Sequence, residues 1–170
     1  MIKAVGSRKN LRNDIYYTYV EDIINSKEIQ YLKNYTHHMC TTRYQHSVNV
    51  SYYNYKMCHW FGLNERAGAR AGLLHDLYFY STNNKPSRNH LKSHPELALH
   101  NASEIFELSP LEMDIIEKHM FPITRKLPKY KETVIIILVD KYCALAEHIF
   151  YRLEKISLSR KKKKLNMYNQ

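Results

Sequence analysis

Apolar residues recur along the chain at the spacing of helices rather than of strands. The clearest stripe lies between residues 42 and 61, where five side chains follow one another at intervals of 4, 3, 4 and 3. These side chains are His46, Val50, Tyr53, Met57 and Trp60. Such intervals place all five on one face of a helix, so the sequence predicts a helix over 42–61 with a mostly apolar face.

The same patterning predicts further helices, three of which carry start signals. Asn64 is a suitable N-cap, and residues 93–96 (SHPE) and 109–112 (SPLE) have the S-x-x-E form of a capping box, with Pro in the first turn. Residues 134–139 are β-branched but lie inside a longer helical pattern, so we expect helix there. The predicted helices cover residues 15–33, 65–76, 93–108, 109–120 and 131–156, with loops over 81–89 and 122–130.

The composition supports one helical domain. A chain of 170 residues suffices for about one domain, and only 4 Gly and 5 Pro leave few connections, which favours long helices. We find no internal repeat and no linker. The sequence therefore predicts an all-α, single-domain helical bundle over residues 14–158, preceded by a loose leader over 1–13 and followed by a basic tail over 159–170.

Charge and cysteine content limit the binding partners and the cellular compartment that we expect. The run from Arg160 to Lys164 supplies five of the +10 net charge; we expect a solvated tail, with RNA, DNA or an anionic membrane as the alternative contact. The three cysteines are widely spaced without a C-x-x-C pair, which disfavours disulfides and thiolate zinc sites and fits a reducing cytoplasm. The leader lacks the apolar stretch of a secretory signal, and no aliphatic run approaches the roughly 20 residues that span a bilayer.

Several ionisable residues lie on faces that should be buried. Asp140 shares a helix face with Ile136 and Cys143, and a lone buried carboxylate there would cost several kcal/mol. Taken singly, such residues are more often a core histidine with a hydrogen-bond partner or an aspartate paired with arginine. The set contains three histidines and two aspartates on four predicted helices: His46, His75, Asp76, His119 and Asp140. One shared site, neutralised by a metal or another cation, is the economical explanation.

The order of these residues resembles that of a known family. His46-Ser47, then Leu74-His75-Asp76, then His94-Pro95, then His119, then Asp140-Lys141 follow the pattern H…HD…H…H…D. This resembles the HD superfamily of metal-dependent phosphohydrolases over roughly residues 42 to 150.

The resemblance implies a helical bundle around a metal centre. His46, His75, Asp76 and Asp140 would bind a first ion, and His94 and His119 would bind a second, with Asp76 bridging. His100 is the rival of His94, although it lacks the following proline. The nitrogen and oxygen ligands suit one or two ions of Fe, Mn, Co, Zn or Mg per chain.

Two departures from the family pattern limit the implied substrate. The HD pair is followed by Leu77-Tyr78-Phe79-Tyr80 instead of the common x-G-K, so a phosphate-binding lysine is missing there. His119 is followed by Met120-Phe121-Pro122, which lacks the paired histidines and Gly-Tyr-Pro of the cyclic-di-nucleotide phosphodiesterases. We therefore do not expect cyclic-di-GMP cleavage.

The expected activity is hydrolysis of a small phosphate ester, with a nucleotide as one candidate substrate. A divalent ion would activate water and bind a phosphoryl oxygen, and Asp76 would orient the water. Arg43, one turn before His46, and Lys141 are candidate phosphate contacts, with Lys92 as a third. Two alternatives stay open: a di-iron oxygenase with the same ligands, and a metal-stabilised binding module with a basic tail. We expect the remaining histidines at the surface: His37, His38, His59, His90 and His148.

Overall fold

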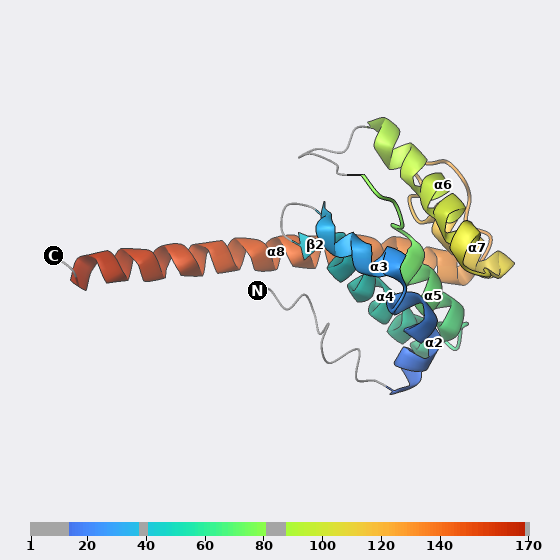
Figure 1. Cartoon of the computed structure of the whole chain (residues 1–170), viewed down its shortest axis with the longest axis horizontal. Helices are drawn as coiled ribbons and strands as arrows, with labels where there is room; N and C mark the ends of the chain where they lie inside the picture. The colour runs from blue at the N-terminus through green and yellow to red at the C-terminus, as the bar shows by residue number, and fades with distance from the viewer. Residues whose placement is uncertain (1–13, 38–40, 81–87, 169–170) are drawn as a thin grey trace.

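The computed structural model describes residues 14–37, 41–80 and 88–168, and this part of the chain is all-α (Figure 1). A pair of two-residue antiparallel strands is its only sheet. The elements in chain order are α2 (Asp14–Ile24), α3 (Lys27–Tyr31), the 3-10 turn η2 (Leu32–Asn34), β1 (Thr36–His37), β2 (Thr41–Thr42), α4 (Arg43–Trp60), α5 (Glu65–Leu74), α6 (Arg88–Ile105), α7 (Pro110–Lys118) and α8 (Lys131–Tyr168). The predicted leader and most of the predicted 81–89 loop lie outside the described residues.

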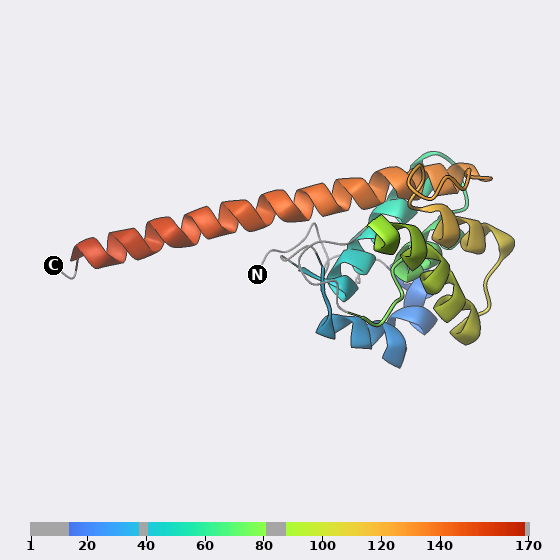
Figure 2. The same cartoon turned by 90° about the horizontal axis from the view of Figure 1, so that it is seen from above.

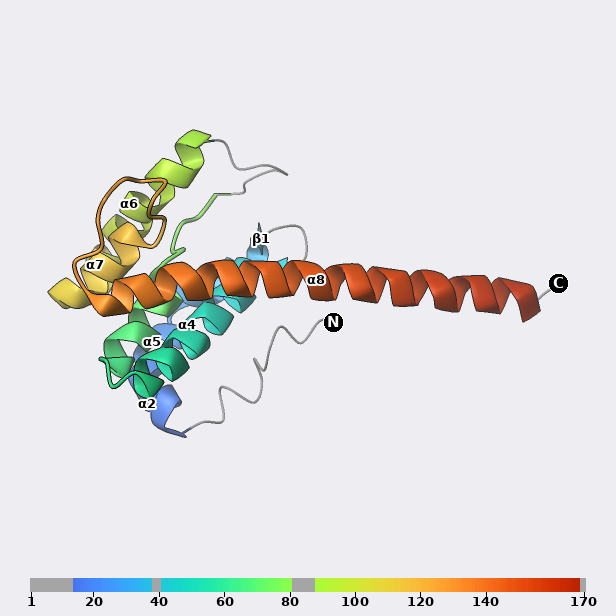
Figure 3. The same cartoon turned by 180° about the vertical axis from the view of Figure 1, so that it is seen from behind.

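Helix α5 lies at the centre of the bundle. It packs against α4, α7 and α2, while α8 crosses the far side of α4 and then extends past the other helices (Figures 2 and 3). Small residues allow this close packing: a Cβ added to Gly72 would lie 2.8 Å from the Cα of Ser51 on α4. The backbones of α4 and α5 are therefore nearly in contact at this point. This close approach fixes the distance between the two helices at the centre of the core.

Several predicted boundaries are confirmed. The structure has α4, α5, α7 and the start of α8 within two residues of the predicted positions. The Ser109 hydroxyl accepts from the N–H of Glu112 while the Glu112 carboxylate accepts from the N–H of Ser109, which is the predicted capping box. The Asn64 side chain accepts from the N–H of Ala67 at 3.0 Å and caps α5. Local side-chain chemistry therefore determines where these helices begin.

Two predicted helix boundaries were wrong for local reasons. Helix α6 begins at Arg88, not at Ser93, whose hydroxyl donates to the carbonyl of His90 within the helix instead of capping it. The predicted 15–33 helix is broken after Ile24, because Ser26 is an extended N-cap that accepts from the N–H of Ile29 and starts α3. The sequence around a serine therefore does not show whether that serine caps a helix or lies inside one.

The predicted stripe of α4 is only partly buried. His46 and Val50 are buried and Tyr53 and Met57 half-buried, but Trp60 is 77% exposed, which corrects the prediction for that residue. Trp60 lies in the last turn of α4 and stacks on Phe61 at the surface. Helix α8 also continues to Tyr168, beyond the predicted end at Ile156.

No helix within the described ranges combines the length and the apolar character needed to cross a bilayer.

Gly72→Ala is expected to destabilise the protein by about 1–3 kcal/mol, because the new methyl group would force α4 and α5 apart. Helix propensity alone predicts the opposite sign, since alanine in a helix is about 1 kcal/mol better than glycine. Urea unfolding followed by circular dichroism measures the difference. A variant as stable as the natural protein would contradict the close backbone contact described here.

Candidate metal centre

Five helices bring the six predicted ligands together. His46 comes from α4, His94 from α6 and Asp140 from α8, whereas His75 and His119 are the C-cap residues of α5 and α7. All are buried except Asp140, whose side chain is 16% exposed. The six residues are His46, His75, Asp76, His94, His119 and Asp140. The structure thus places these residues in one cluster near the middle of the bundle.

One half of the cluster lies between α4, α5 and α8. The Nε2 atom of His46 is 3.0 Å from Oδ1 of Asp140, and Nε2 of His75 is 3.8 Å from the same oxygen. Ligand atoms of these three residues all lie within 4.8 Å of one another, close enough for one ion to reach all of them. Oδ2 of Asp76 lies 3.8 Å from the His75 Nε2 atom.

The other half lies between α5, α6 and α7. His75, Asp76 and His119 again offer ligand atoms within 4.8 Å of one another. Oδ1 of Asp76 lies 3.4 Å from Nε2 of His94 and 3.9 Å from Nε2 of His119. The two carboxylate oxygens of Asp76 therefore face different histidines, which is the arrangement a bridging ligand would need. His100 is exposed, so His94 rather than His100 lies at this position.

Backbone carbonyls set the tautomers of three histidines. The Nδ1–H groups of His75, His94 and His119 lie 2.9, 3.0 and 2.8 Å from the carbonyls of Gly72, His90 and Ile116 in turn. A carbonyl only accepts, so each Nδ1 carries a proton, and the lone pair of the corresponding neutral tautomer lies on Nε2, which faces the cluster.

In these tautomers, no described residue donates a hydrogen bond to the Nε2 lone pairs. Nε2 of His94 and Nε2 of His119 are 3.0 Å apart, and Nε2 of His75 is buried with no hydrogen-bond partner among the described residues. A buried acceptor without a partner costs about 1–3 kcal/mol. A cation between these nitrogens would satisfy them, so the residues present fit a metal site, and their nitrogen and oxygen ligands suit a first-row transition ion or Mg²⁺.

The charges around the cluster shift the pKa values in opposite directions. Burial lowers the pKa of His46, but the charge of Glu147 and the hydrogen bond to Asp140 outweigh burial and raise that pKa to about 10. Burial lowers the pKa of His119, and the repulsion it would meet from protonated forms of His75 and His94 lowers it further, to about 3. For Asp140, the effect of burial is outweighed by His46, which holds its pKa well below the usual range. In the metal-free cluster His46 is therefore the protonated histidine near neutral pH.

Glu147 is a candidate site residue that the sequence analysis missed. Its carboxylate accepts from Nδ1 of His46 at 3.1 Å and from the side-chain amide of Asn49 at 2.7 Å, and it is buried. Histidine ligands of metals commonly donate their second N–H to such a carboxylate, which fixes ring orientation. The available signal was its position seven residues after Asp140, two turns along the same face of α8.

The predicted phosphate contacts lie in different settings. The Arg43 guanidinium is fully buried, donates to the carbonyls of Tyr78 and Tyr80, and stacks 3.6 Å from the ring of Tyr78. Lys141 is exposed and donates to the carbonyl of Ile137 at 3.1 Å. Lys92 is exposed at the surface of α6.

The remaining histidines separate into groups. His59 is exposed as predicted, His148 is half-buried, and the side chains of His37 and His38 lie outside the described residues. His90, predicted at the surface, is half-buried, with its ring stacked 4.9 Å from that of His94 and Nδ1 2.7 Å from the hydroxyl of Tyr80.

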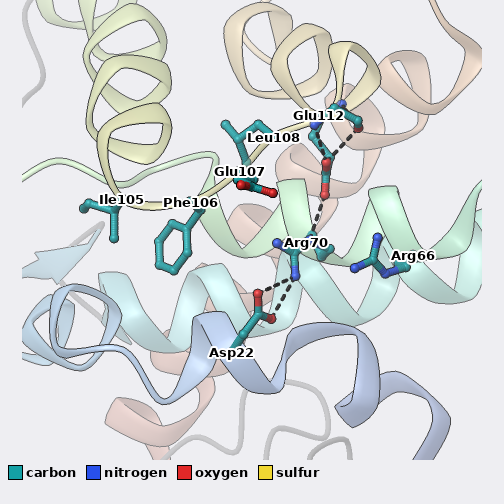
Figure 4. A pocket seen from close by; sticks show the side chains of 9 residues that line it. Asp22, Arg66, Arg70, Ile105, Phe106, Glu107, Leu108 and Glu112 are labelled. Atoms are coloured by element: carbon teal, nitrogen blue, oxygen red, sulfur yellow. Dashed lines mark hydrogen bonds and ion pairs between the residues drawn. The ribbon is translucent and has the colours of Figure 1, made fainter.

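A pocket of about 590 Å³ lies away from this cluster, between α2, α5 and the α6–α7 connection (Figure 4). The buried Arg70 crosses it, bonding Asp22 on one side at 2.8 Å and Glu112 on the other at 2.9 Å. Because these carboxylates hold the guanidinium from both sides, we assign Arg70 to fastening α2 and α7 onto α5.

The fold and the cluster define an all-α protein with a buried histidine–carboxylate site of the kind that binds metals. The sequence model of the HD domain family matches residues 43–145, so the chain belongs to the HD domain family, whose members are mostly metal-dependent hydrolases. The matched span contains all six clustered residues. No curated protein and no solved structure matches the chain.

Glu147→Gln is expected to weaken metal binding about 10- to 100-fold. A glutamine amide can donate to Nδ1 of His46, which moves the ring proton to Nε2 and blocks the ligand atom. Isothermal titration with Mn²⁺ measures the affinity, and Glu154→Gln, one glutamate further along α8, is the matched control. Equal affinity in the Glu147→Gln and natural proteins would remove Glu147 from the metal centre.

Metal binding is expected to release about one proton per chain near neutral pH, because the ion replaces the proton held on His46. Since the pKa of His46 is raised to about 10, affinity should increase with pH up to that value and weaken as pH falls. Calorimetry in two buffers of different ionisation enthalpy counts the protons. Binding heats that do not depend on the buffer would contradict a protonated His46.

Proposed function

We propose that this HD domain protein is a metal-dependent phosphohydrolase that cleaves a small phosphate ester, with a nucleotide as one candidate substrate. The observation that carries the proposal is the convergence of buried histidine Nε2 atoms with two carboxylates, within the span that the HD-family model matches. Family membership alone supports only the general class, and the lone-pair geometry adds the reason to expect an intact metal site.

In this proposal the cluster holds two divalent ions. His46, His75, Asp76 and Asp140 hold the first, and Asp76 shares the second with His94 and His119. The candidates are Fe, Mn, Co, Zn and Mg. Such ions lower the pKa of coordinated water and draw charge from a phosphoryl oxygen.

The chain's own residues have three further roles in the proposal. Asp76 would orient the attacking water through a carboxylate oxygen. Lys141, exposed beside Asp140, offers an ammonium group to the substrate phosphate. Arg43 acts as a positioning residue, because its guanidinium already binds the carbonyls that follow the HD pair and would lose those bonds on reaching for a phosphate.

Asp76→Asn is expected to lose bound metal and to reduce phosphate release at least about 100-fold, because the bridging charge between both ions is removed. Elemental analysis of the purified protein and phosphate release from a panel of nucleotides and p-nitrophenyl phosphate provide the readouts. Glu21→Gln, an exposed glutamate on α2, is the control and should keep both properties.

The alternatives give distinct results in the same experiment. One ion per chain in the natural protein would reduce the proposal to a mononuclear site and leave His94 and His119 as substrate contacts. Oxygen consumption by the iron-loaded protein without phosphate release would replace hydrolysis by oxygenase chemistry. Metal content without either activity, and nucleic-acid retention that is lost on deleting residues 159–170, would favour a binding module.

A further inference from the structure

Helix α8 carries a stripe of exposed apolar side chains on the face turned away from the metal centre. The stripe consists of Val134, Leu138, Tyr142, Leu145, Ile149, Leu153 and Ile156, which are 47–62% exposed. On the opposite face Ile136, Val139 and Glu147 are buried against the bundle. The helix is therefore apolar on both sides, and the described residues cover only one of them.

The spacing of the stripe suits a long contact between helices. Its intervals are 4, 4, 3, 4, 4 and 3 residues, an eleven-residue repeat in which Val134, Leu145 and Ile156 are equivalent. An eleven-residue repeat corresponds to about 3.67 residues per turn, close to an ordinary α-helix. The stripe therefore stays on one face over its whole length, including the part of α8 that extends past the other helices (Figures 1 and 2).

The area of the stripe is that of a protein interface. Each of its seven half-exposed side chains presents roughly 100 Å² of apolar surface, or roughly 700 Å² together. Monomeric proteins rarely expose a continuous apolar patch above about 300–600 Å². Each partner in a stable, specific interface contributes about 800 Å², so this face is large enough to hold one partner helix.

The length and area of the stripe favour a second copy of this chain as that partner. Across a two-fold axis the same surface contacts itself, so residue i of one copy faces residue j of the other and j faces i. In an antiparallel pair with the axis at Leu145, Val134 faces Ile156, while Leu138 and Tyr142 lie within one residue of the positions opposite Leu153 and Ile149.

Charge selects the antiparallel direction. A parallel pair would place the exposed Lys141, Arg152 and Lys155 next to their own copies and would bring together two runs of five positive charges at 160–164. An antiparallel pair moves these runs to opposite ends. We propose that the chain forms a homodimer in which two α8 helices pack antiparallel along this stripe, with the two-fold axis at Leu145.

Sedimentation equilibrium of the full chain tests the association. The natural protein is expected to be dimeric at micromolar concentration, and Leu145→Glu to weaken the dimer at least about 30-fold, because two carboxylates would meet at the axis. Leu127→Glu is the matched control: this leucine is 71% exposed but lies in the α7–α8 loop, so its variant should stay dimeric. A natural protein that remains monomeric, or that leaves solution only with phosphatidylserine vesicles, overturns the proposal.

Cross-linking tests the orientation. In a background with Cys40 replaced by serine, Leu145→Cys should form a dimer with a short bis-maleimide, since the buried Cys58 and Cys143 do not react. Leu138→Cys and Leu153→Cys should each fail alone and cross-link when the two proteins are mixed. Efficient cross-linking of either variant with itself would show a parallel pair and overturn the antiparallel arrangement.

Discussion

The structure depends on one electrostatic constraint, the meeting of histidine lone pairs and carboxylates in a buried volume. Nε2 of His94 faces Nε2 of His119, and Asp76 and Asp140 add negative charge beside them. Such groups repel one another unless a cation lies between them. Five helices converge on this point, so the bundle gathers groups whose repulsion a proton or another cation would relieve.

Backbone groups at helix ends orient two of these ligands. His75 and His119 both follow the last residue of a helix, and each donates to the carbonyl three residues earlier, which has no partner within the helix. Gly72 supplies one of these carbonyls and also allows α4 and α5 to approach closely. The geometry of α5 therefore fixes both the spacing of the core and the tautomer of a ligand.

The sequence predicted those features of the site that depend on the burial of single residues. Ionisable residues on apolar faces, such as His46 and Asp140, pointed to the cluster because burying them needs a compensating charge. The pairing of Glu147 with His46 was not predictable, since it joins residues 101 positions apart through the packing of α8 on α4. The false start at Ser93 and the exposed Trp60 have the same origin, because tertiary packing decides whether a serine caps or a helix face is covered.

The inner contacts of α8 fix the rotation of the helix about its axis and therefore the direction in which its outer stripe points. Asp140 and Glu147 contact the same imidazole from positions two turns apart, so turning the helix by one residue, about 100°, would break both contacts and rotate the outer stripe with them. If an ion and a dimer formed through that stripe both favoured this rotation of α8, linkage would raise their two affinities by the same factor.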